Sequence, residues 1–405
     1  MLISRNKRGE FIFTLHYSKA QLKKMNNEST FYCPQCTEKV ILKIGTHKIP
    51  HFAHLIGSNC SSEPETPQHI KGKILLYRAL TKKYSHVELE KFFPQIRQRA
   101  DVALKSKGNL YAIEYQCSGI SEEELIKRTS GYERIDVHVL WLLGKKIESK
   151  FQHGNQYVLL SPLQQMFIQF SEKNGYWLPY LNSEEGVIHY YSDLIPVSNR
   201  KFKASIFSQP IPQIELPLSL PNKNNTHYTL AEWVHDRKSW IQNKLLYNKG
   251  IHDPFLKEVY QSNDFPTQLP LFIGLPLKHS IQYKTDCIPW QYYLWKDVLK
   301  NKKSGEVISK NEIGSAIRKR LKNGKIQKRE FPLISSSQSP VSEYIRLLNR
   351  LGIVEIIDHK YLILRKEWKA GRTVDDYQKE SKEFLNDFKE KLTQDNGVKK
   401  EKANL

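Results

Sequence analysis

Two carboxylates on neighbouring strand-like segments are the first candidates for chemistry in this sequence. Residues 98–104 and 110–116 alternate apolar and polar side chains, and the residues between them have the composition of a tight turn. We therefore expect an antiparallel hairpin, with Asp101 near the start of one strand and Glu114 near the end of the next. Carboxylates held close together on a rigid support can bind Mg²⁺ or Mn²⁺ and assist phosphodiester hydrolysis.

The same pair also has a purely structural interpretation. Glutamate is disfavoured inside strands, and Glu114 stands among apolar and aromatic neighbours, where an unpaired charge is costly. Its partner would be either a metal ion or an arginine such as Arg97 or Arg99. The spacing of the two carboxylates leaves both alternatives open.

Cysteines and histidines gather near the start of the chain with the spacing of a zinc site. Cys33 and Cys36 are separated by two residues, His51 and His54 follow, and Cys60 comes shortly after them. Zinc takes four nitrogen or sulfur ligands, so this segment offers one more than is needed. We expect Zn²⁺ on Cys33, Cys36, His51 and His54, with Cys60 as the alternative ligand. The other interpretation is a set of buried thiols with histidines packed beside an aromatic ring.

A dense basic stretch, residues 300–329, is the strongest candidate for contact with nucleic acid. Lys319, Arg320 and Lys322 lie on a predicted helix within it and are expected to contact DNA phosphates. No pattern for reading bases is present, so the binding would tolerate any sequence. The alternative is a solvated basic face. The aromatic residues at 290–295 could stack on single-stranded bases, but their helical spacing favours core packing.

The elements that must position these residues indicate an α/β fold. A helix is expected from Thr66-Pro67 to about residue 80, because a capping residue precedes a proline in the first turn. After the hairpin, the sequence predicts a helix over 121–134 and a buried strand over 137–143. The order helix, strand, strand, helix, strand is typical of an α/β core.

The remainder of the chain is expected to be mainly helical. Helices are predicted at 288–300, 309–322 and 340–351, and a hairpin-like run at 353–364 follows. This order is compatible with a winged-helix module, and a helical domain without any DNA role is the alternative. The expected parts are a zinc-finger-like element (1–62), an α/β core (63–150), a linker and helical region (151–280), a helical basic domain (281–368) and a charged tail (369–405).

Composition limits the possible functions. The 405 residues carry 63 Lys and Arg against 42 Asp and Glu, a formal charge of +21 that suits a polyanionic partner. No segment approaches the ~20 consecutive apolar residues of a membrane span, and the first residues lack the apolar core of a signal peptide. We therefore expect a cytoplasmic protein without membrane contact, in which reduced thiols serve as metal ligands.

Three short motifs resemble the nuclease domain of the competence protein CoiA family. They are an Arg-x-Asp strand (99–101), a Glu-x-Gln strand end (114–116) and a serine-rich helix start (118–121). The family also has an N-terminal paired-cysteine motif and a His-Phe-x-His motif, which occurs here at 51–54. The resemblance covers about residues 10–145. It implies a nuclease core of the PD-(D/E)XK superfamily.

By this resemblance, Asp101 and Glu114 are the ligands of a catalytic Mg²⁺ or Mn²⁺ ion. Arg128 and Tyr132, on one face of the following helix, also match the family's pattern.

The resemblance departs from the commonest superfamily motif at one position. Gln116 stands where that motif has lysine, and glutamine offers only hydrogen bonds to water or phosphate. His69 and Lys73 are candidates for the missing basic group, because they lie four residues apart on the preceding helix and so share a face. A solvated basic face is the alternative interpretation of that helix.

The resemblance implies a metal-dependent DNA nuclease that acts in natural transformation. Incoming DNA, in single-stranded form, would be the substrate, and recombination proteins would be partners. The alternative is a DNA-binding recombination accessory protein that has the nuclease fold but no longer cleaves.

Overall fold

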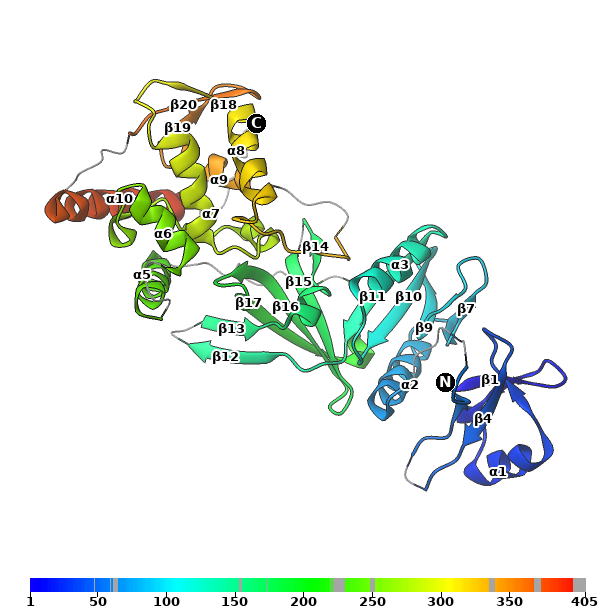
Figure 1. The fold of residues 1–405 in the computed structure, drawn as a ribbon. Coiled ribbons are helices and arrows are strands. Elements are labelled where there is room, and N and C mark those ends of the chain that lie inside the picture. Colours follow the sequence, from blue (N-terminus) through cyan, green and yellow to red (C-terminus); the bar gives the residue numbers. More distant parts are fainter. Residues whose placement is uncertain are drawn as a thin grey trace, which may run out of the picture.

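The computed structural model describes residues 1–46, 48–58, 60, 65–152, 155–172, 174–218, 220, 230–247, 252–334, 339–367 and 373–395. The molecule is elongated, with three parts in a row (Figure 1). A small N-terminal module lies at one end, a large sheet with its helices forms the middle, and a mainly helical part forms the other end.

The N-terminal module is a five-stranded antiparallel sheet with the strand order β2-β1-β3-β4-β5 and one helix. Its core is small and includes the buried residues Leu22, Phe31 and Phe52. The elements are β1 (Ile3–Asn6), β2 (Phe11–Phe13), η1 (Thr14–His16), α1 (Lys19–Glu28), β3 (Phe31–Tyr32), β4 (Lys39–Lys43) and β5 (His51–His54).

The central part is built on a ten-stranded mixed sheet with the order β12-β13-β17-β16-β15-β11-β10-β9-β6, and β14 pairs with β15 off this path. The strands are β6 (Val87–Leu89), β9 (Val102–Ser106), β10 (Asn109–Gln116), β11 (Val137–Leu143), β12 (Glu148–Gln152), β13 (Asn155–Leu159), β14 (Gln169–Ser171), β15 (Gly175–Asn182), β16 (Val187–Pro196) and β17 (Lys201–Pro210). The other elements are β7 (Phe92–Phe93), β8 (Gln98–Arg99), α2 (Pro67–Thr81), α3 (Glu122–Glu133), α4 (Pro162–Gln165) and η2 (Ile211–Gln213).

The expected α/β fold is confirmed, and its local order explains how the hairpin is placed. Strands β9 and β10 pair antiparallel, and α3 then returns the chain so that β11 runs parallel to β10. Such a crossover needs a covering element between parallel strands, which the helix provides. The apolar run 137–143 is buried along most of its length, as expected for a central strand.

The stretch 151–280, expected to be a linker and helical region, differs from that expectation. Its first part contributes strands β13, β16 and β17 to the same sheet as β10 and β11. The α/β core therefore extends well beyond residue 150. Strand β15 of the same sheet shows no alternation, because it is buried along nearly its whole length, and it carries Pro179, a residue that normally argues against a central strand.

The C-terminal part contains the arrangement expected for a winged helix. Helices α7, α8 and α9 are combined with a three-stranded sheet of order β18-β20-β19. The elements are α5 (Leu230–Tyr247), α6 (Pro254–Gln261), η4 (Pro266–Gln268), η5 (Lys278–Gln282), α7 (Cys287–Leu294), η6 (Trp295–Leu299), β18 (Val307–Ser309), α8 (Lys310–Lys322), α9 (Pro340–Arg350), β19 (Val354–Ile356), β20 (Tyr361–Leu364) and α10 (Val374–Asp395).

Part of the expected charged tail is integrated into this C-terminal part. Helix α10 packs Phe384 and Phe388 against Trp233 of α5, with ring centroids 6.3 and 5.4 Å from the indole. Both phenylalanines are buried, so the helix belongs to the same core as α7 and α9.

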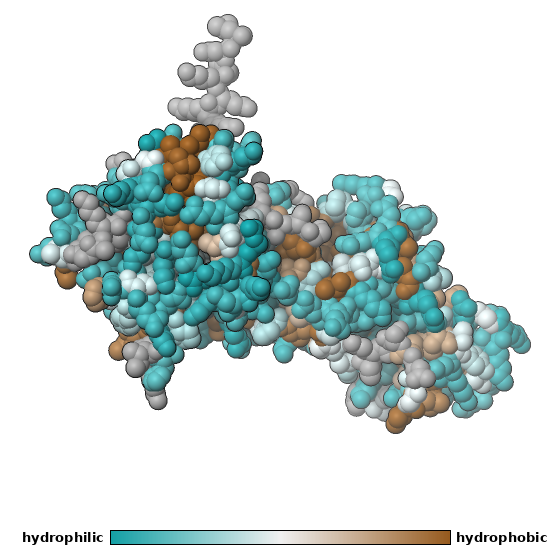
Figure 2. Space-filling model, turned by 45° about the horizontal axis from the view of Figure 1, so that its top comes forward, coloured by the Kyte–Doolittle hydropathy of each residue, from teal (hydrophilic) through white to brown (hydrophobic). Residues whose placement is uncertain are grey.

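The surface is mainly polar. Figure 2 shows hydrophilic side chains over most of one face, with small separate hydrophobic patches, the most prominent over the C-terminal part. Among the described residues, no helix is both long and apolar enough to cross a membrane.

Candidate nuclease-like site and metal centre

Asp101 lies at the point where the β9–β10 ladder ends. The last registered pair is Val102 with Ile113, which brings Asp101 level with Glu114 on the neighbouring strand. The carboxylate of Asp101 accepts a hydrogen bond from the backbone N–H of Tyr115, with 2.9 Å between Oδ2 and the nitrogen. This bond fixes the carboxylate at the end of the hairpin, as the sequence predicts.

Helix α2 brings a histidine to the same carboxylate. The helix begins at Pro67, and the Thr66 side chain caps it by accepting a hydrogen bond from the backbone N–H of His69. The His69 Nε2 atom lies 2.9 Å from Asp101 Oδ2. The approach of helix to sheet is close, because a Cβ atom on Gly72 would lie 2.1 Å from the ring of Tyr115.

The surroundings of Asp101 favour its ionised form. Burial by itself would raise the pKa of Asp101, but the charge and hydrogen bond of His69 and the charge of Lys73 lower it to about 2. Lys73 Nζ lies 3.8 Å from Asp101 Oδ1. A carboxylate that remains charged at neutral pH is suited to attract a cation or to orient a histidine.

Glu114 has a different environment, because its carboxylate is held by two side chains of α3. Arg128 Nη2 lies 2.6 Å from Oε2, and the Tyr132 hydroxyl donates to Oε1 at 2.5 Å. Burial raises the pKa of Glu114, although Arg128 and Tyr132 act in the opposite direction. The ion pair expected as the structural alternative therefore exists, and its partner is Arg128 rather than Arg97 or Arg99.

Lys73 does not project from a basic helix face. Its side chain is fully buried, and its ammonium group lies 2.8 Å from Glu65 and 2.5 Å from Glu90. Burial would lower the pKa of Lys73, but the charges of Glu65 and Glu90 raise it. The lysine thus stays protonated and acts within a buried ionic network beside Asp101. Neither Glu65 nor Glu90 belongs to a motif, although Glu65 directly precedes the capping Thr66.

A small cleft of about 100 Å³ opens at this end of the hairpin. Asp101, His69, Gln116 and Arg128 line it together. The Gln116 side chain donates hydrogen bonds to the hydroxyl and carbonyl oxygens of Ser118, at 3.2 and 3.4 Å. Glu114, only 1% exposed, does not line the cleft. The structure therefore brings together the sequence-predicted residues, but with Arg128 in contact with one of the two expected metal ligands.

The donors fit a hard divalent cation in type, though they do not form a complete cage. Carboxylate oxygens are the ligands that Mg²⁺ and Mn²⁺ prefer, and Mg²⁺ keeps several waters. Within the described part of the chain, no group of three or more acidic, cysteine or histidine donors gathers at this cleft. Asp101 and Glu114 would hold such an ion only together with water, and only if Arg128 shared the Glu114 carboxylate.

Four side chains of the N-terminal module form a compact set of soft ligands. The ligand atoms of Cys33, Cys36, His54 and Cys60 all lie within 4.8 Å of one another. Cys36 Sγ and His54 Nε2 are 3.3 Å apart. Two or more thiolates with imidazole in a tetrahedral set favour Zn²⁺.

The structure favours the alternative zinc ligand, Cys60, over one of the expected ligands. His51 lies on the same strand as His54, but it is not part of the four-residue set. Its Nδ1 atom is 2.9 Å from the carbonyl oxygen of Ile49. In β5, the two histidines are three residues apart and therefore point to opposite faces of the strand. The spacing of the motif did not show which of the two would join the cysteines.

The three residues expected to contact DNA phosphates on α8 are not equivalent. Lys319 and Lys322 are exposed, whereas Arg320 is 9% exposed and forms ion pairs with Asp297 and Glu258, both at 2.6 Å. Arg320 therefore connects α8 to the rest of the C-terminal core and does not face solvent. The aromatic residues at 290–295 are buried in that core, as their spacing favoured.

Comparisons with known proteins cover nearly the whole chain. Residues 14–63 match the N-terminal domain of competence protein CoiA, residues 65–223 its nuclease-like domain, and residues 229–376 its C-terminal domain. The competence protein CoiA of Bacillus subtilis (strain 168) is 26% identical over 297 residues, which is 69% of this chain and 75% of that protein. No solved structure matches. The chain thus belongs to the competence protein CoiA family.

Proposed function

We propose that this protein is a Mg²⁺- or Mn²⁺-dependent DNA nuclease of the competence machinery, which cleaves DNA at the cleft beside Asp101. Membership of the CoiA family, with its nuclease-like domain, supports a role in competence. The observation that carries the cleavage proposal is the ionised Asp101 at the end of the β9–β10 hairpin, in contact with His69 and beside Gln116.

Each residue has a proposed role in this reaction. Asp101 and Glu114 would hold the divalent ion, which when bound supplies Lewis-acid stabilisation of the phosphate. Gln116 would position the attacking water by hydrogen bonding, and His69, oriented by Asp101, would exchange protons at the cleft. The positive charge of Lys73, which is buried beside Asp101, keeps the Asp101 carboxylate ionised. Arg128 is available to a phosphate when it releases Glu114.

One observation favours a second candidate function, a DNA-binding recombination accessory protein without cleavage. The Glu114 carboxylate is already neutralised by Arg128 and bonded to Tyr132, and Gln116 lacks the charge of a catalytic lysine. In that case the cleft would bind phosphate through Arg128 and would not hold a catalytic metal.

Cleavage of pure DNA by the pure protein separates the two functions. Single- and double-stranded DNA are incubated with the protein in Mg²⁺, Mn²⁺ or a chelator. We expect metal-dependent cleavage that is abolished by Asp101→Asn and retained by Asp136→Asn, which makes the same change at an exposed position. Binding without cleavage under all conditions would establish the accessory function.

We further propose that the protein works in the cytosol, where reduced thiols of Cys33, Cys36 and Cys60 can bind Zn²⁺ together with His54. Its DNA would be single-stranded and of any sequence, and recombination proteins that handle the same DNA would be its partners. The excess of basic residues supports a polyanionic partner.

A further inference from the structure

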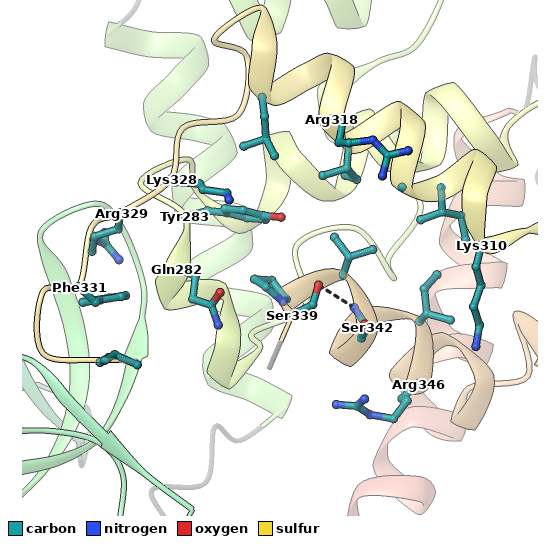
Figure 3. Close-up of a pocket in the computed structure, with 18 of the residues that line it drawn as sticks. Gln282, Tyr283, Lys310, Arg318, Lys328, Arg329, Phe331, Ser339, Ser342 and Arg346 are labelled. Atoms are coloured by element: carbon teal, nitrogen blue, oxygen red, sulfur yellow. Dashed lines mark hydrogen bonds between the residues drawn. The ribbon is translucent and has the colours of Figure 1, made fainter. Parts of the chain in front are cut away.

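The winged-helix-like module contains a groove that is far larger than the nuclease-like cleft. It has a volume of about 860 Å³ and lies between helices α8 and α9 (Figure 3). One wall is the face of α8 that carries Ile313 and Ile317, the opposite wall is the first half of α9, and residues 328–334 close the side next to Tyr283. The groove is separate from Asp101 and its neighbours, which line a different cleft.

Positive side chains surround this groove. Lys310 and Arg318 come from α8, Lys328 from the segment that follows it, and Arg346 from α9 (Figure 3). Arg318, Lys328 and Arg346 are exposed. Glu330 is the one carboxylate among the described residues that line the groove. The resulting field attracts an anion.

The floor of the groove is apolar and aromatic. Ile313, Ile317 and Ile345 contribute aliphatic surface, and Tyr283 and Phe331 contribute rings. The Tyr283 side chain extends toward the space between the helices (Figure 3). A ligand that fills this groove must therefore combine negative charge with flat apolar groups, and a chain of nucleotides has that chemistry.

The shape of the groove favours unpaired bases over a duplex. In a winged helix that reads a duplex, the recognition helix must stand out from the surface to enter the major groove. Here Ser342 and Arg346, on the exposed face of α9, line the wall of the groove. A single strand can enter such a groove with its bases on the apolar floor and its phosphates on the basic rim. A duplex presents its phosphates outward and keeps its bases stacked.

We propose that the groove between α8 and α9 binds single-stranded DNA. This proposal rests on the function proposed above, in which DNA is the partner. It places the single strand at a site that neither binds the metal ion nor cleaves DNA. The C-terminal part would then hold a strand while the nuclease-like domain acts on DNA, which gives separate residues for binding and for chemistry.

Charge removal inside the groove, compared with equal charge removal outside it, tests this proposal. One variant of the full chain carries Lys310→Gln, Arg318→Gln and Lys328→Gln. The control carries Lys238→Gln, Lys257→Gln and Lys366→Gln, three exposed lysines of the C-terminal part that do not line the groove. Binding of a fluorescein-labelled oligothymidylate is followed by anisotropy over a series of salt concentrations, and melting temperatures establish that both variants are folded.

We expect the groove variant to bind about tenfold or more weakly, and its salt dependence to fall by about two units of slope, since a single strand releases roughly 0.7 counterion per phosphate contact. The control should change affinity much less. Equal losses in the two variants would mean that binding depends only on net charge, and the proposal would be overturned. It would also be overturned if neither variant differed from the unmodified protein.

A second variant tests the contribution of the bases. Phe331→Leu keeps an apolar side chain beside Tyr176, whose ring centroid lies 6.1 Å from that of Phe331, but it removes the aromatic face. We expect weaker oligothymidylate binding, by about fivefold or more, with an unchanged salt slope. Poly-glutamate serves as competitor. If it displaces the oligonucleotide as well as unlabelled oligothymidylate does, the groove recognises acidic protein segments and the single-strand proposal fails.

The outcomes for the groove and for the cleavage site are distinguishable. A groove variant that binds like the control, in a protein that still cleaves DNA through Asp101, rejects the groove and leaves the proposed function intact. A protein that binds no DNA at all rejects both. Selective loss of binding in the groove variant supports the groove even if the protein proves unable to cleave.

Discussion

Asp101 and Glu114 end the same hairpin but have opposite electrostatic surroundings. Asp101 faces His69 and Lys73, whose charges outweigh burial and lower its pKa to about 2. At Glu114, burial outweighs the contact with Arg128 and raises the pKa of the carboxyl group. Asp101 is thus the carboxylate that presents a charge to the cleft, whereas the Glu114 carboxylate is bound by Arg128 and Tyr132 of α3.

The lowered pKa of Asp101 predicts a pH dependence of stability. A carboxyl group with a pKa near 2 when folded and near 4 when unfolded stabilises the folded state above about pH 4, and this contribution is lost as the pH falls toward 2. Unfolding by urea, measured for the unmodified protein and for Asp101→Asn, should therefore show a difference in free energy that shrinks by about 2 kcal/mol between neutral pH and pH of about 2.

Because the two proteins are compared at each pH, protonation of groups remote from Asp101 cancels from the difference. Asp136→Asn, the same substitution at an exposed position, is the control. A difference for Asp101→Asn that stays constant, or grows, in acid would mean that His69 and Lys73 do not govern the ionisation of Asp101.

At the scale of elements, helix α2 must lie unusually close to strand β10 for His69 to reach Asp101. Gly72 makes this approach possible, because a Cβ atom there would lie 2.1 Å from the Tyr115 ring. We expect Gly72→Ala to separate helix from sheet and to lower the free energy of unfolding by about 1–3 kcal/mol, as overpacked cores do. The His69–Asp101 contact should lengthen, so cleavage should weaken as well.

Thermal and urea denaturation measure the first effect, and the cleavage assay measures the second. Gly119→Ala is the matched control, since a Cβ atom at that position meets nothing within 4 Å. If Gly72→Ala is as stable and as active as Gly119→Ala, the close packing of α2 is not what positions His69.

Local patterns sufficed to predict the elements around the site. The predicted helices at 66–80 and 121–134 correspond to α2 and α3, and the predicted strand at 137–143 is β11. Caps, a turn and hydrophobic periodicity lie within short windows, so they can be read without knowing the tertiary fold. The strands after residue 150 could not be predicted in this way, because their pairing partners are distant in sequence.

For the candidate site, local patterns likewise predicted the residues but not their contacts. Asp101 and Glu114 follow from alternation and spacing, but the partners of these carboxylates depend on how helices pack on the sheet. Arg128 reaches Glu114 from α3. The family resemblance singled out Arg128, but nothing in the local spacing identified it as the partner of Glu114. The buried position of Lys73 likewise depends on where α2 lies against the sheet.

The ligand set of the N-terminal module gives a prediction for that element. Cys60→Ser should remove zinc, because a tetrahedral site loses one of its four ligands, and should destabilise the small five-stranded sheet. His51→Gln should keep about one zinc per chain, since His51 lies outside the set. Metal analysis of purified proteins measures both. Zinc retained in Cys60→Ser and lost in His51→Gln would restore the ligand set expected from spacing.

At the scale of the whole molecule, the N-terminal module and the nuclease-like domain are joined through a buried ionic network. Glu90 accepts hydrogen bonds from the backbone N–H groups of Leu2 and Ile3, at 2.8 to 3.1 Å, and pairs with Lys73. Glu65 pairs with the same lysine. Since Lys73 also faces Asp101, the network links strand β1 to the cleft. The N-terminal module therefore supports the proposed catalytic site from behind.

Glu90 is the residue on which this connection depends most. Its backbone has a φ of 51°, in the left-handed region that costs a residue with a Cβ atom about 1–2 kcal/mol. The hydrogen bonds to β1 and the Lys73 contact offset that cost. Glu90→Gln removes the negative charge that pairs with Lys73. It also places an amide N–H group among groups that themselves donate hydrogen bonds, so we expect the free energy of unfolding to fall by about 3–5 kcal/mol.

The part of the chain that loses protection from hydrogen exchange distinguishes a broken connection between the N-terminal module and the nuclease-like domain from general destabilisation. Hydrogen exchange should accelerate in β1 and around Asp101 while β15 and β16, in the middle of the sheet, remain protected. Glu88→Gln is the control, because Glu88 lies in β6, two residues before Glu90, with its side chain 61% exposed and paired only with Lys91 among the described ion pairs. Uniform acceleration in Glu90→Gln would indicate one cooperative unit. Unchanged exchange in β1 would mean that the N-terminal module is held to the nuclease-like domain by other contacts.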